Sequence, residues 1–385
     1  MEFDKWLNEC LVSIEDHNGP NAVKLLFNVQ VTNSPHNKAN LKSAISQVIN
    51  RGFRQDPESI QRWTNFFTNH TLGKSFRNKK FEHFRDAYKE LLVILEKEIE
   101  DVWFHAIIQK YSKVLFSEGN KASKLDEVFN CYRKLMGLCQ MCKPPNQFRA
   151  FGLYHVLIMS FKVLFRLNKL QSCPSLLRAV ESEHAKLPPI SQFPKAHQVE
   201  FKYYQGRFCI YEQEFEKAEQ CLDYAFRRCH SGSIRNKRIL LLYLVPVKLW
   251  RGKFPTPQLL SKYKLPELET LMTYLKQGNV GAYSSQLTAY QDKFIQQGTF
   301  IMMEMLKLLA YRNLFKRTHF VLDSFQVPLS KFLKALQVSG VTEMDMPELE
   351  CVLSNLIYKG WVKGYVSSTK KVLVLSKQNP FPKLN

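Results

Sequence analysis

The spacing of apolar residues is helical over most of the chain. Residues 81–116, FEHFRDAYKELLVILEKEIEDVWFHAIIQKYSKVLF, place apolar side chains three and four positions apart, with charged residues between them. Residues 160–181 show the same spacing, but the pattern is divided near Asn168, and Pro174 lies early in its second part. No convincing run of strands precedes residue 360. The pattern therefore predicts an all-α fold.

One segment carries the signature of a helical repeat. In FKYYQGRFCIYEQEFEKAEQCLDYAFRRC, Gly206 is followed by Ala218, Leu222 and Ala225. These offsets match the packing positions of a tetratricopeptide (TPR) helix pair, in which small residues let two helices approach and a leucine fills the groove between them. An ordinary helical hairpin is the alternative. Because one repeat cannot bury its own apolar face, we favour an irregular, TPR-like helical-repeat solenoid.

The C-terminal part of the chain changes character. Residues 311–325 and 329–337 each have the apolar spacing of a helix. Asp345 is placed to cap a third helix, with Glu348 three positions later as in a capping box. Gly360 is placed to end this third helix.

Two short β-type runs follow, WVKGYV and KVLVL, joined by a polar turn. Three helices and a two-stranded hairpin are the elements of a winged helix, a relative of the helix-turn-helix, and the hairpin is its wing. We therefore divide the chain into an N-terminal helical region (1–130), a helical-repeat part (131–310), and a winged helix with a C-terminal tail (311–385).

The net charge narrows the class of partner. The chain of 385 residues has 55 Lys and Arg against 34 Asp and Glu, a formal net charge of +21. Residues 1–100 hold 14 basic and 13 acidic side chains, so the remainder carries +20 of this charge. A polyanion-binding surface is therefore expected in the C-terminal three quarters, although a protein that is merely basic is the alternative.

Composition also bounds the compartment. The nine cysteines are an odd number scattered over a large chain, which favours buried thiols in a reducing compartment over a disulfide framework. The longest apolar stretch, Ile239 to Val247, is too short to span a bilayer and contains Pro246. We therefore expect a soluble intracellular protein without membrane insertion.

Cations without intervening acids gather between Ala225 and Pro255. No Asp or Glu falls in that interval. Lysines and arginines there could contact phosphates of RNA or DNA, or an acidic protein partner, and a solvated charged rim is the third alternative. The candidate residues are Arg227, Arg228, Arg235, Lys237, Arg238, Lys248, Arg251 and Lys253.

The predicted wing is a second candidate for nucleic-acid binding. Trp361 and Tyr365 alternate on one face with Lys363, so this face could meet a phosphate backbone or stack on a base, or the rings could cover the core. The third helix carries Asp345, Glu348 and Glu350, which would repel phosphates, so base-specific readout by this helix is not expected. The candidate wing residues are Lys359, Trp361, Lys363, Tyr365, Lys370 and Lys371.

No enzyme signature is present in the sequence. The GKS at 73–75 has Thr68 where a phosphate-binding loop needs glycine, and the Rossmann, nucleophile-elbow and zinc-hydrolase patterns are absent. Cys139 and Cys142 form a lone Cys-x-x-Cys near Cys131, which we interpret as buried free thiols in an apolar helix. We therefore predict no catalytic residue, no metal site and no cofactor.

Several long strings resemble the PCI-domain family, whose members combine a helical solenoid with a winged helix. The resemblance covers roughly residues 130–385, whereas residues 1–130 match only loosely. It is carried by FKYYQGRF, NKRILLLYLVPVKLWRGKFPTPQLLSKY, YRNLF, NLIYKGWVKGYVS and SKQNPFP. The strings are similar to those of the PCI subunit of the second transcription-and-export complex (TREX two, also called AMEX).

This resemblance implies a non-enzymatic scaffold subunit in nuclear mRNA export, located at nuclear pores and the nuclear envelope periphery, with a cytoplasmic pool in addition. The partners implied are a GANP-like PCI scaffold protein and a small acidic protein of the proteasome-lid type, alongside RNA or DNA. The alternative is a PCI subunit of a proteasome-lid or signalosome-like assembly that binds no nucleic acid. Salt-dependent binding of RNA or DNA separates the two hypotheses.

Overall fold

The computed structural model describes residues 1–28, 38–52, 56–75, 79–97, 102–140, 152–181 and 188–384. The chain divides into two compact units, residues 1–204 and 205–385. Helices dominate both units, which confirms the predicted helical class. Within these described ranges, none of the helices combines the length and apolar character that a membrane span requires.

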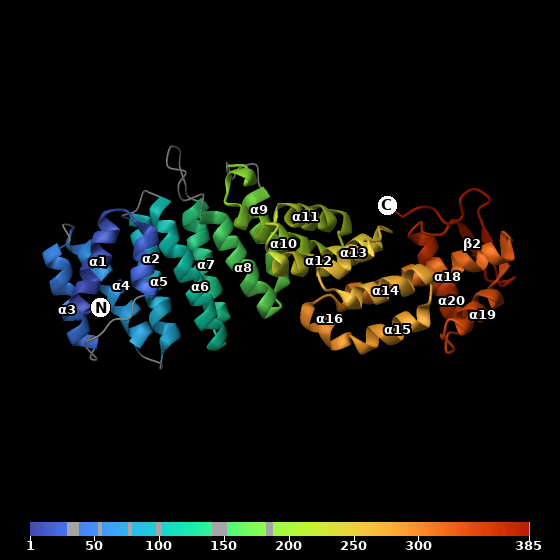
Figure 1. The fold of residues 1–385 in the computed structure, drawn as a ribbon, viewed down its shortest axis with the longest axis horizontal. Helices are drawn as coiled ribbons and strands as arrows, with labels where there is room; N and C mark the ends of the chain where they lie inside the picture. Colours follow the sequence, from blue (N-terminus) through green and yellow to red (C-terminus); the bar gives the residue numbers. More distant parts are fainter. Residues whose placement is uncertain are drawn as a thin grey trace. The chain divides into compact units, whose positions relative to one another are not determined.

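The first unit is a series of helices, and neighbours in the chain from α4 to α8 pack against each other (Figure 1). The helices are α1 (Phe3–Glu15), α2 (Gly19–Asn28), α3 (Lys38–Gly52), α4 (Pro57–Ser75), α5 (Lys80–Lys97), α6 (His105–Lys121), α7 (Leu125–Gln140), α8 (Leu153–Leu167) and α9 (Cys173–Glu181). Large aromatic side chains fill the core, among them Trp6, Trp63, Tyr88, Tyr111 and Tyr132.

The predicted division near Asn168 is confirmed. Helix α8 ends at Leu167, and Asn168 adopts a left-handed conformation with φ of 56°. Asparagine tolerates this conformation better than most residues, so it can end a helix where glycine is absent. A 3₁₀ turn (Leu170–Ser172) then leads into α9, in which Pro174 is the second residue.

The first unit contains the cysteines that the sequence predicted to be buried in an apolar helix. Cys131 and Cys139 of α7 are both buried. The predicted Cys-x-x-Cys partner, Cys142, lies outside the described residues. The two described thiols are therefore core residues of an amphipathic helix.

The second unit begins within α10 (Lys195–Tyr211) and continues as a chain of helix pairs. These helices are α11 (Phe215–Arg228), α12 (Ile234–Trp250), α13 (Pro257–Lys262), α14 (Pro266–Gln277), α15 (Val280–Ala289), α16 (Gln291–Gln297) and α17 (Phe300–Met305). Glycines in the left-handed conformation follow two of these helices: φ is 68° at Gly252 after α12 and at Gly278 after α14.

The repeat signature has the packing that its spacing predicts. A Cβ atom at Gly206 in α10 would lie 2.6 Å from Cγ of Leu222 in α11, closer than real side chains pack. Leu222 is fully buried, as are Ala218 and Ala225 on the same face of α11. The missing side chain at Gly206 therefore lets Leu222 fill the space beside α10.

The end of the second unit is a winged helix. Its helices are α18 (Lys307–Leu322), α19 (Leu329–Val338) and α20 (Met346–Tyr358), and its strands are β1 (Gln326–Pro328), β2 (Gly364–Ser367) and β3 (Val372–Leu375). The sheet is antiparallel in the order β1-β3-β2, with Val327 opposite Leu373 and Tyr365 opposite Val374. The fold class predicted from the sequence, helical repeats followed by a winged helix, is confirmed.

The strand β1 corrects one expectation. Val327–Pro328 lies between the helices expected at 311–325 and 329–337, and no strand was expected before residue 360. The segment instead pairs with β3, so the hairpin becomes a three-stranded sheet. A three-residue edge strand whose partner is far along the chain leaves too short an alternating pattern to recognise, and proline is tolerated at such an edge.

The predicted cap of the third helix is also confirmed. The carboxylate of Asp345 accepts a hydrogen bond from the backbone N–H of Glu348 at 2.8 Å. Leu349, Leu353 and Leu356 of α20 are fully buried on one face. The division into segments 1–130, 131–310 and 311–385 stays a prediction, because the two compact units meet at residue 204 and do not separate a repeat part from a winged helix.

Candidate nucleic-acid interface

The wing places part of the predicted set in solvent. Lys363 immediately before β2 and Lys370 in the β2–β3 turn are exposed, and Tyr365 in β2 is 61% exposed. Within the part of the chain that the structure describes, the only wing lysine in a salt bridge is Lys371. Lys363 and Lys370 are thus available to a polyanion, with an exposed aromatic ring on the same hairpin.

The other two wing cations are engaged by the protein. Lys371 donates to the carboxylate of Glu350 in α20 at 2.8 Å, and Ser368 donates to the same carboxylate at 3.1 Å. The hydrogen bond from Lys371 holds the pKa of Glu350 below its ordinary value. Lys359, at the end of α20, lies with its Nζ 5.2 Å from the ring centre of Trp250. These two lysines attach the wing and α20 to their surroundings.

The structure decides between two alternatives that the sequence left open for Trp361: a ring on an exposed face with Lys363 and Tyr365, or a ring that covers the core. Trp361 is buried, and its ring packs edge-on against Trp250 with 4.7 Å between the ring centres. Strand β2 begins three residues later, so the alternation of faces does not extend back to Trp361. Of the two aromatic residues, Trp361 joins the core and Tyr365 faces solvent.

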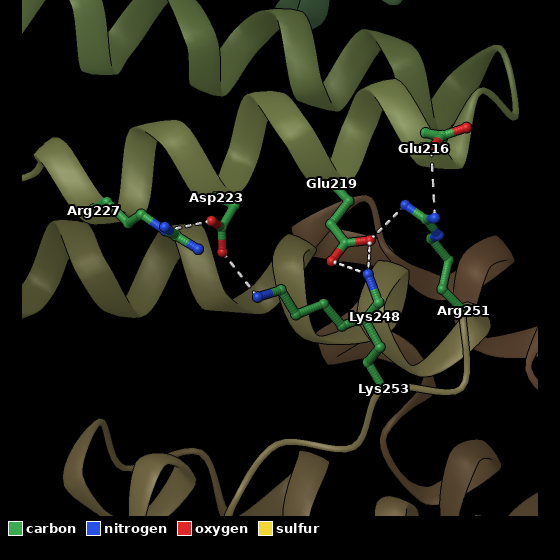
Figure 2. Close-up of polar contacts among 7 residues, drawn as sticks. All are labelled: Glu216, Glu219, Asp223, Arg227, Lys248, Arg251 and Lys253. Atoms are coloured by element: carbon green, nitrogen blue, oxygen red, sulfur yellow. Dashed lines mark hydrogen bonds and ion pairs between the residues drawn. The ribbon is translucent and has the colours of Figure 1, made fainter. Parts of the chain in front are cut away.

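The predicted cations of α11, α12 and the turn after α12 form what we call the α11–α12 cation set. Figure 2 shows that acids of α11 contact four members of this set. Asp223 binds Arg227 Nε at 2.5 Å through one carboxylate oxygen and Lys248 Nζ at 2.8 Å through the other. Burial raises the pKa of Asp223, but the hydrogen bond from Lys248 and the two nearby positive charges outweigh it, so the pKa is lowered.

A second acid holds the other end of the set. Glu219 is buried, and its carboxylate accepts from Arg251 Nη1 at 2.8 Å and from Lys253 Nζ at 2.9 Å (Figure 2). Glu216 lies 3.5 Å from Arg251 Nη2 on the side nearer solvent. Because Glu219 is buried among its partners, removing either cation would leave it poorly compensated. These ion pairs join the turn after α12 to α11.

The remaining four members lie in varied environments. The Arg228 guanidinium is 4.8 Å from the ring centre of Tyr224, and Lys237 Nζ is 4.7 Å from that of Phe226. Arg235 is exposed in the first turn of α12, whereas Arg238 is half-buried. Acids that precede the interval 225–255 therefore pair with half of the set, and a role of the set in binding stays a prediction.

Comparisons with known proteins agree with this fold. The sequence model of the PCI domain family matches residues 287–377. PCI domain-containing protein 2 of Danio rerio is 38% identical over 257 residues, 66% of this chain and 63% of the relative. The Xenopus laevis protein of that name is 40% identical over 237 residues, 62% of this chain and 58% of the relative. Enhanced ethylene response protein 5 of Arabidopsis thaliana is 32% identical over 314 residues, 80% of this chain and 73% of the relative.

This chain belongs to the PCI domain-containing protein 2 family. It covers less than two thirds of the length of the two vertebrate relatives, 63% and 58%. The PCI match includes the wing and α20 but not the α11–α12 cation set. Within this family member, the wing therefore lies in the matched domain, and the ion-paired cations precede it.

The acids that pair with the α11–α12 cation set could have been recognised in the sequence. Glu216, Glu219 and Asp223 are spaced three and four residues apart, so they occupy one face of α11. They stand just before the acid-free interval that begins at Ala225. Sequence reasoning counted charges along the chain, whereas the helix pair brings the acids of one helix against the cations of the next.

The described residues of the PCI protein also bear on whether it has a metal site. In those ranges, no group of three or more His, Cys, Asp or Glu side chains is placed to hold a metal ion. The predicted absence of a catalytic centre, metal and cofactor stays a prediction.

Proposed function

We propose that this chain is a non-enzymatic scaffold or adaptor subunit of the nuclear-pore-associated mRNA export complex, and that it binds RNA or DNA without base specificity. The observation that carries the nucleic-acid part is the wing, where Lys363 and Lys370 are exposed beside the 61% exposed ring of Tyr365. The similarity to PCI domain-containing protein 2 supports the adaptor part.

The charges of the winged helix favour sequence-tolerant binding. A helix that reads bases in the major groove presents Arg, Lys, Asn or Gln to base edges. The first turn of α20 instead carries Asp345 and Glu348, and the next carries Glu350. The exposed lysines and tyrosine of the wing suit a phosphate backbone and the face of an unpaired base, which are common to all sequences.

The same domain offers surface to protein partners. Val338 at the end of α19 is 91% exposed, and Tyr358 at the end of α20 is 90% exposed. Large apolar and aromatic side chains in solvent are enriched where proteins associate. The proposed partners are a GANP-like PCI scaffold and a small acidic protein of the proteasome-lid type, at the nuclear pore.

Binding of labelled RNA over a range of salt concentrations tests the nucleic-acid part. Wild-type protein should bind polyuridine and a mixed-sequence RNA with similar affinity, and affinity should fall as salt rises. The variant Lys363→Ala/Lys370→Ala should reduce the slope of log affinity against log salt by about 1.4, since each single-strand phosphate contact contributes about 0.7. The control Lys113→Ala/Lys134→Ala removes the same charge from exposed positions of α6 and α7.

Purification of the tagged chain from nuclei tests the adaptor part. A PCI scaffold and a small acidic protein should accompany it, and depletion should retain polyadenylated RNA in the nucleus. The alternative is a subunit of a proteasome-lid or signalosome-like assembly without nucleic-acid binding. The internal pairing of Arg227, Lys248, Arg251 and Lys253 favours this alternative, and subunits of such an assembly in the purified material would support it.

A further inference from the structure

A basic groove lies between α14, α18 and the turn after α12, within the second unit. It encloses about 320 Å³ and is lined by Phe254, Lys276, Asn313, Lys316, Arg317 and Phe320. A second hollow of about 310 Å³ shares Phe254, Asn313 and Lys316 with it and continues to Lys383 in the C-terminal tail. Neither hollow has an acidic side chain in its lining. We call the two together the α14–α18 groove.

The fold builds this groove by bringing the end of α14 against α18. Gly278 ends α14 with φ of 68°, and a Cβ atom there would lie 2.5 Å from the backbone nitrogen of Leu314. Asn313 Nδ2 donates to the carbonyl of Leu275 at 2.8 Å, and Arg317 Nη2 donates to that of Lys276 at 3.4 Å. Side chains of α18 thus satisfy the last carbonyls of α14 and fix the groove's wall.

The cations of the groove are not paired with acids in the part of the chain that the structure describes. No Asp or Glu occurs in α18 from Lys307 to Leu322. Among the residues that the structure describes, no carboxylate forms a salt bridge with Lys276, Lys316 or Arg317. Arg312 beneath them is also held by carbonyl oxygens and not by a carboxylate. The positive charge of the groove is therefore open to an external anion.

Aromatic rings stand beside these cations. Lys276 Nζ is 5.2 Å from the ring centre of Phe254, and Lys316 Nζ is 5.7 Å from that of Phe320. Phe320 is 67% exposed, although large apolar side chains are usually buried. Proteins that hold single strands without sequence preference combine a basic groove with rings on which bases stack.

We propose that the α14–α18 groove binds a single-stranded segment of RNA or DNA. Lys276, Lys316 and Arg317 contact consecutive phosphates, and a base stacks on Phe320. This inference rests on the proposed nucleic-acid binding and adds a site separate from the wing. An acidic peptide would use the same cations, but the exposed ring beside them favours a ligand with planar bases.

The test uses the full chain, polyuridine, duplex RNA of matched length, and a polyglutamate peptide as probes. Lys316→Ala/Arg317→Ala should reduce the salt slope for polyuridine by about 1.4. Phe320→Leu should weaken polyuridine binding by about fivefold or more and leave duplex binding unchanged, while Phe320→Trp should retain affinity. Lys113→Ala/Lys134→Ala again controls for charge, and circular dichroism checks that each variant is folded.

Photocrosslinking gives a readout that does not depend on affinity. Polyuridine irradiated in complex with wild-type protein should label peptides that contain Phe320 or Phe254. Labelling confined to wing peptides would overturn the groove, as would unchanged affinity and salt slope in the groove variants. If the wing variant alone loses binding, the proposed function stands without the groove.

Two further results would overturn the inference in different ways. If groove variants lose polyglutamate and keep polyuridine, an acidic protein occupies the groove. If wild-type protein binds no nucleic acid at any salt concentration, the proposed nucleic-acid function and the groove both fail. The groove is supported if Phe320→Leu loses polyuridine binding and Phe320→Trp keeps it. A structural defect would not depend on whether residue 320 carries a ring on which a base can stack.

Discussion

Replacing Gly206 by alanine should disrupt the contact between α10 and α11. The new Cβ atom would lie 2.6 Å from Cγ and 2.9 Å from Cδ2 of Leu222, both under the closest approach of real Cβ atoms. Leu222 is fully buried, so it cannot move aside into solvent. The helices must therefore separate or the leucine must leave its preferred rotamer.

The magnitude follows from two opposing effects. Overpacking of a filled core costs about 1–3 kcal/mol. Alanine in a helix interior is favoured over glycine by about 1 kcal/mol, so the net loss of stability should reach up to about 2 kcal/mol. Gly137 in α7 is the matched control, because a Cβ atom there meets nothing within 4 Å. Gly137→Ala should gain about 1 kcal/mol, since only the propensity changes.

Native-state hydrogen exchange is the suitable assay, because the protein has two units and a single unfolding transition is not assured. Amides of α11 should exchange faster in Gly206→Ala, and amides of α7 more slowly in Gly137→Ala. Leu222→Ala alone should cost about 2–5 kcal/mol through its cavity. In the double variant, the alanine methyl at position 206 partly fills that cavity, so the two losses should not add. Equal gains in both glycine variants, or strict additivity, would refute the proposed contact.

Three further changes test other parts of the fold. Asp345→Ala removes the α20 cap and should cost about 1 kcal/mol by urea unfolding, whereas exposed Glu343→Ala should change little. Arg312→Ala removes donors to the carbonyls of Trp361 and Pro382, so limited proteolysis should cleave the C-terminal tail faster than in wild type. Burial lowers the pKa of His155 to about 3, so between pH 6.5 and 3 the unfolded chain binds a proton that the folded chain does not. As pH is lowered from 6.5 to 3, stability measured by thermal unfolding should therefore decrease, and it should decrease less steeply in His155→Gln.

Local signals allowed much of the fold to be predicted from the sequence. Asp345 and Glu348 stand at the spacing that a helix cap requires, and the hydrogen bond between them depends only on neighbouring residues. Gly206 and Leu222 stand at a spacing fixed by a helix pair, so their contact was also predictable. β1 was missed because its only signal is its pairing with β3, from which it is separated in the chain by two helices, α19 and α20, and by β2.

The candidate site was less predictable because its properties depend on tertiary contacts. The α14–α18 groove draws Phe254, Lys276 and Phe320 from three segments that are separate in the sequence, so no single segment shows that their side chains line one hollow. Conversely, the interval 225–255 has a conspicuous pattern, but acids of the preceding helix oppose half of its candidate cations. Counting charges along the sequence of a helical-repeat chain therefore does not show which surface is available to bind an anion.

The free energy of phosphate binding depends on which cations are already paired. A phosphate approaching Arg251 or Lys253 must compete with the Glu219 carboxylate at 2.8 and 2.9 Å, and displacing that buried acid would leave it uncompensated. Among the described residues, no carboxylate forms a salt bridge with Lys316 or Arg317, so a phosphate there gains the release of bound counterions without breaking such a pair. Nucleic acid should consequently prefer the groove and the wing to the α11–α12 cation set, although the cation set has more basic residues than either. Charge reversal at Arg251 should therefore impair folding, whereas charge reversal at Arg317 should impair binding.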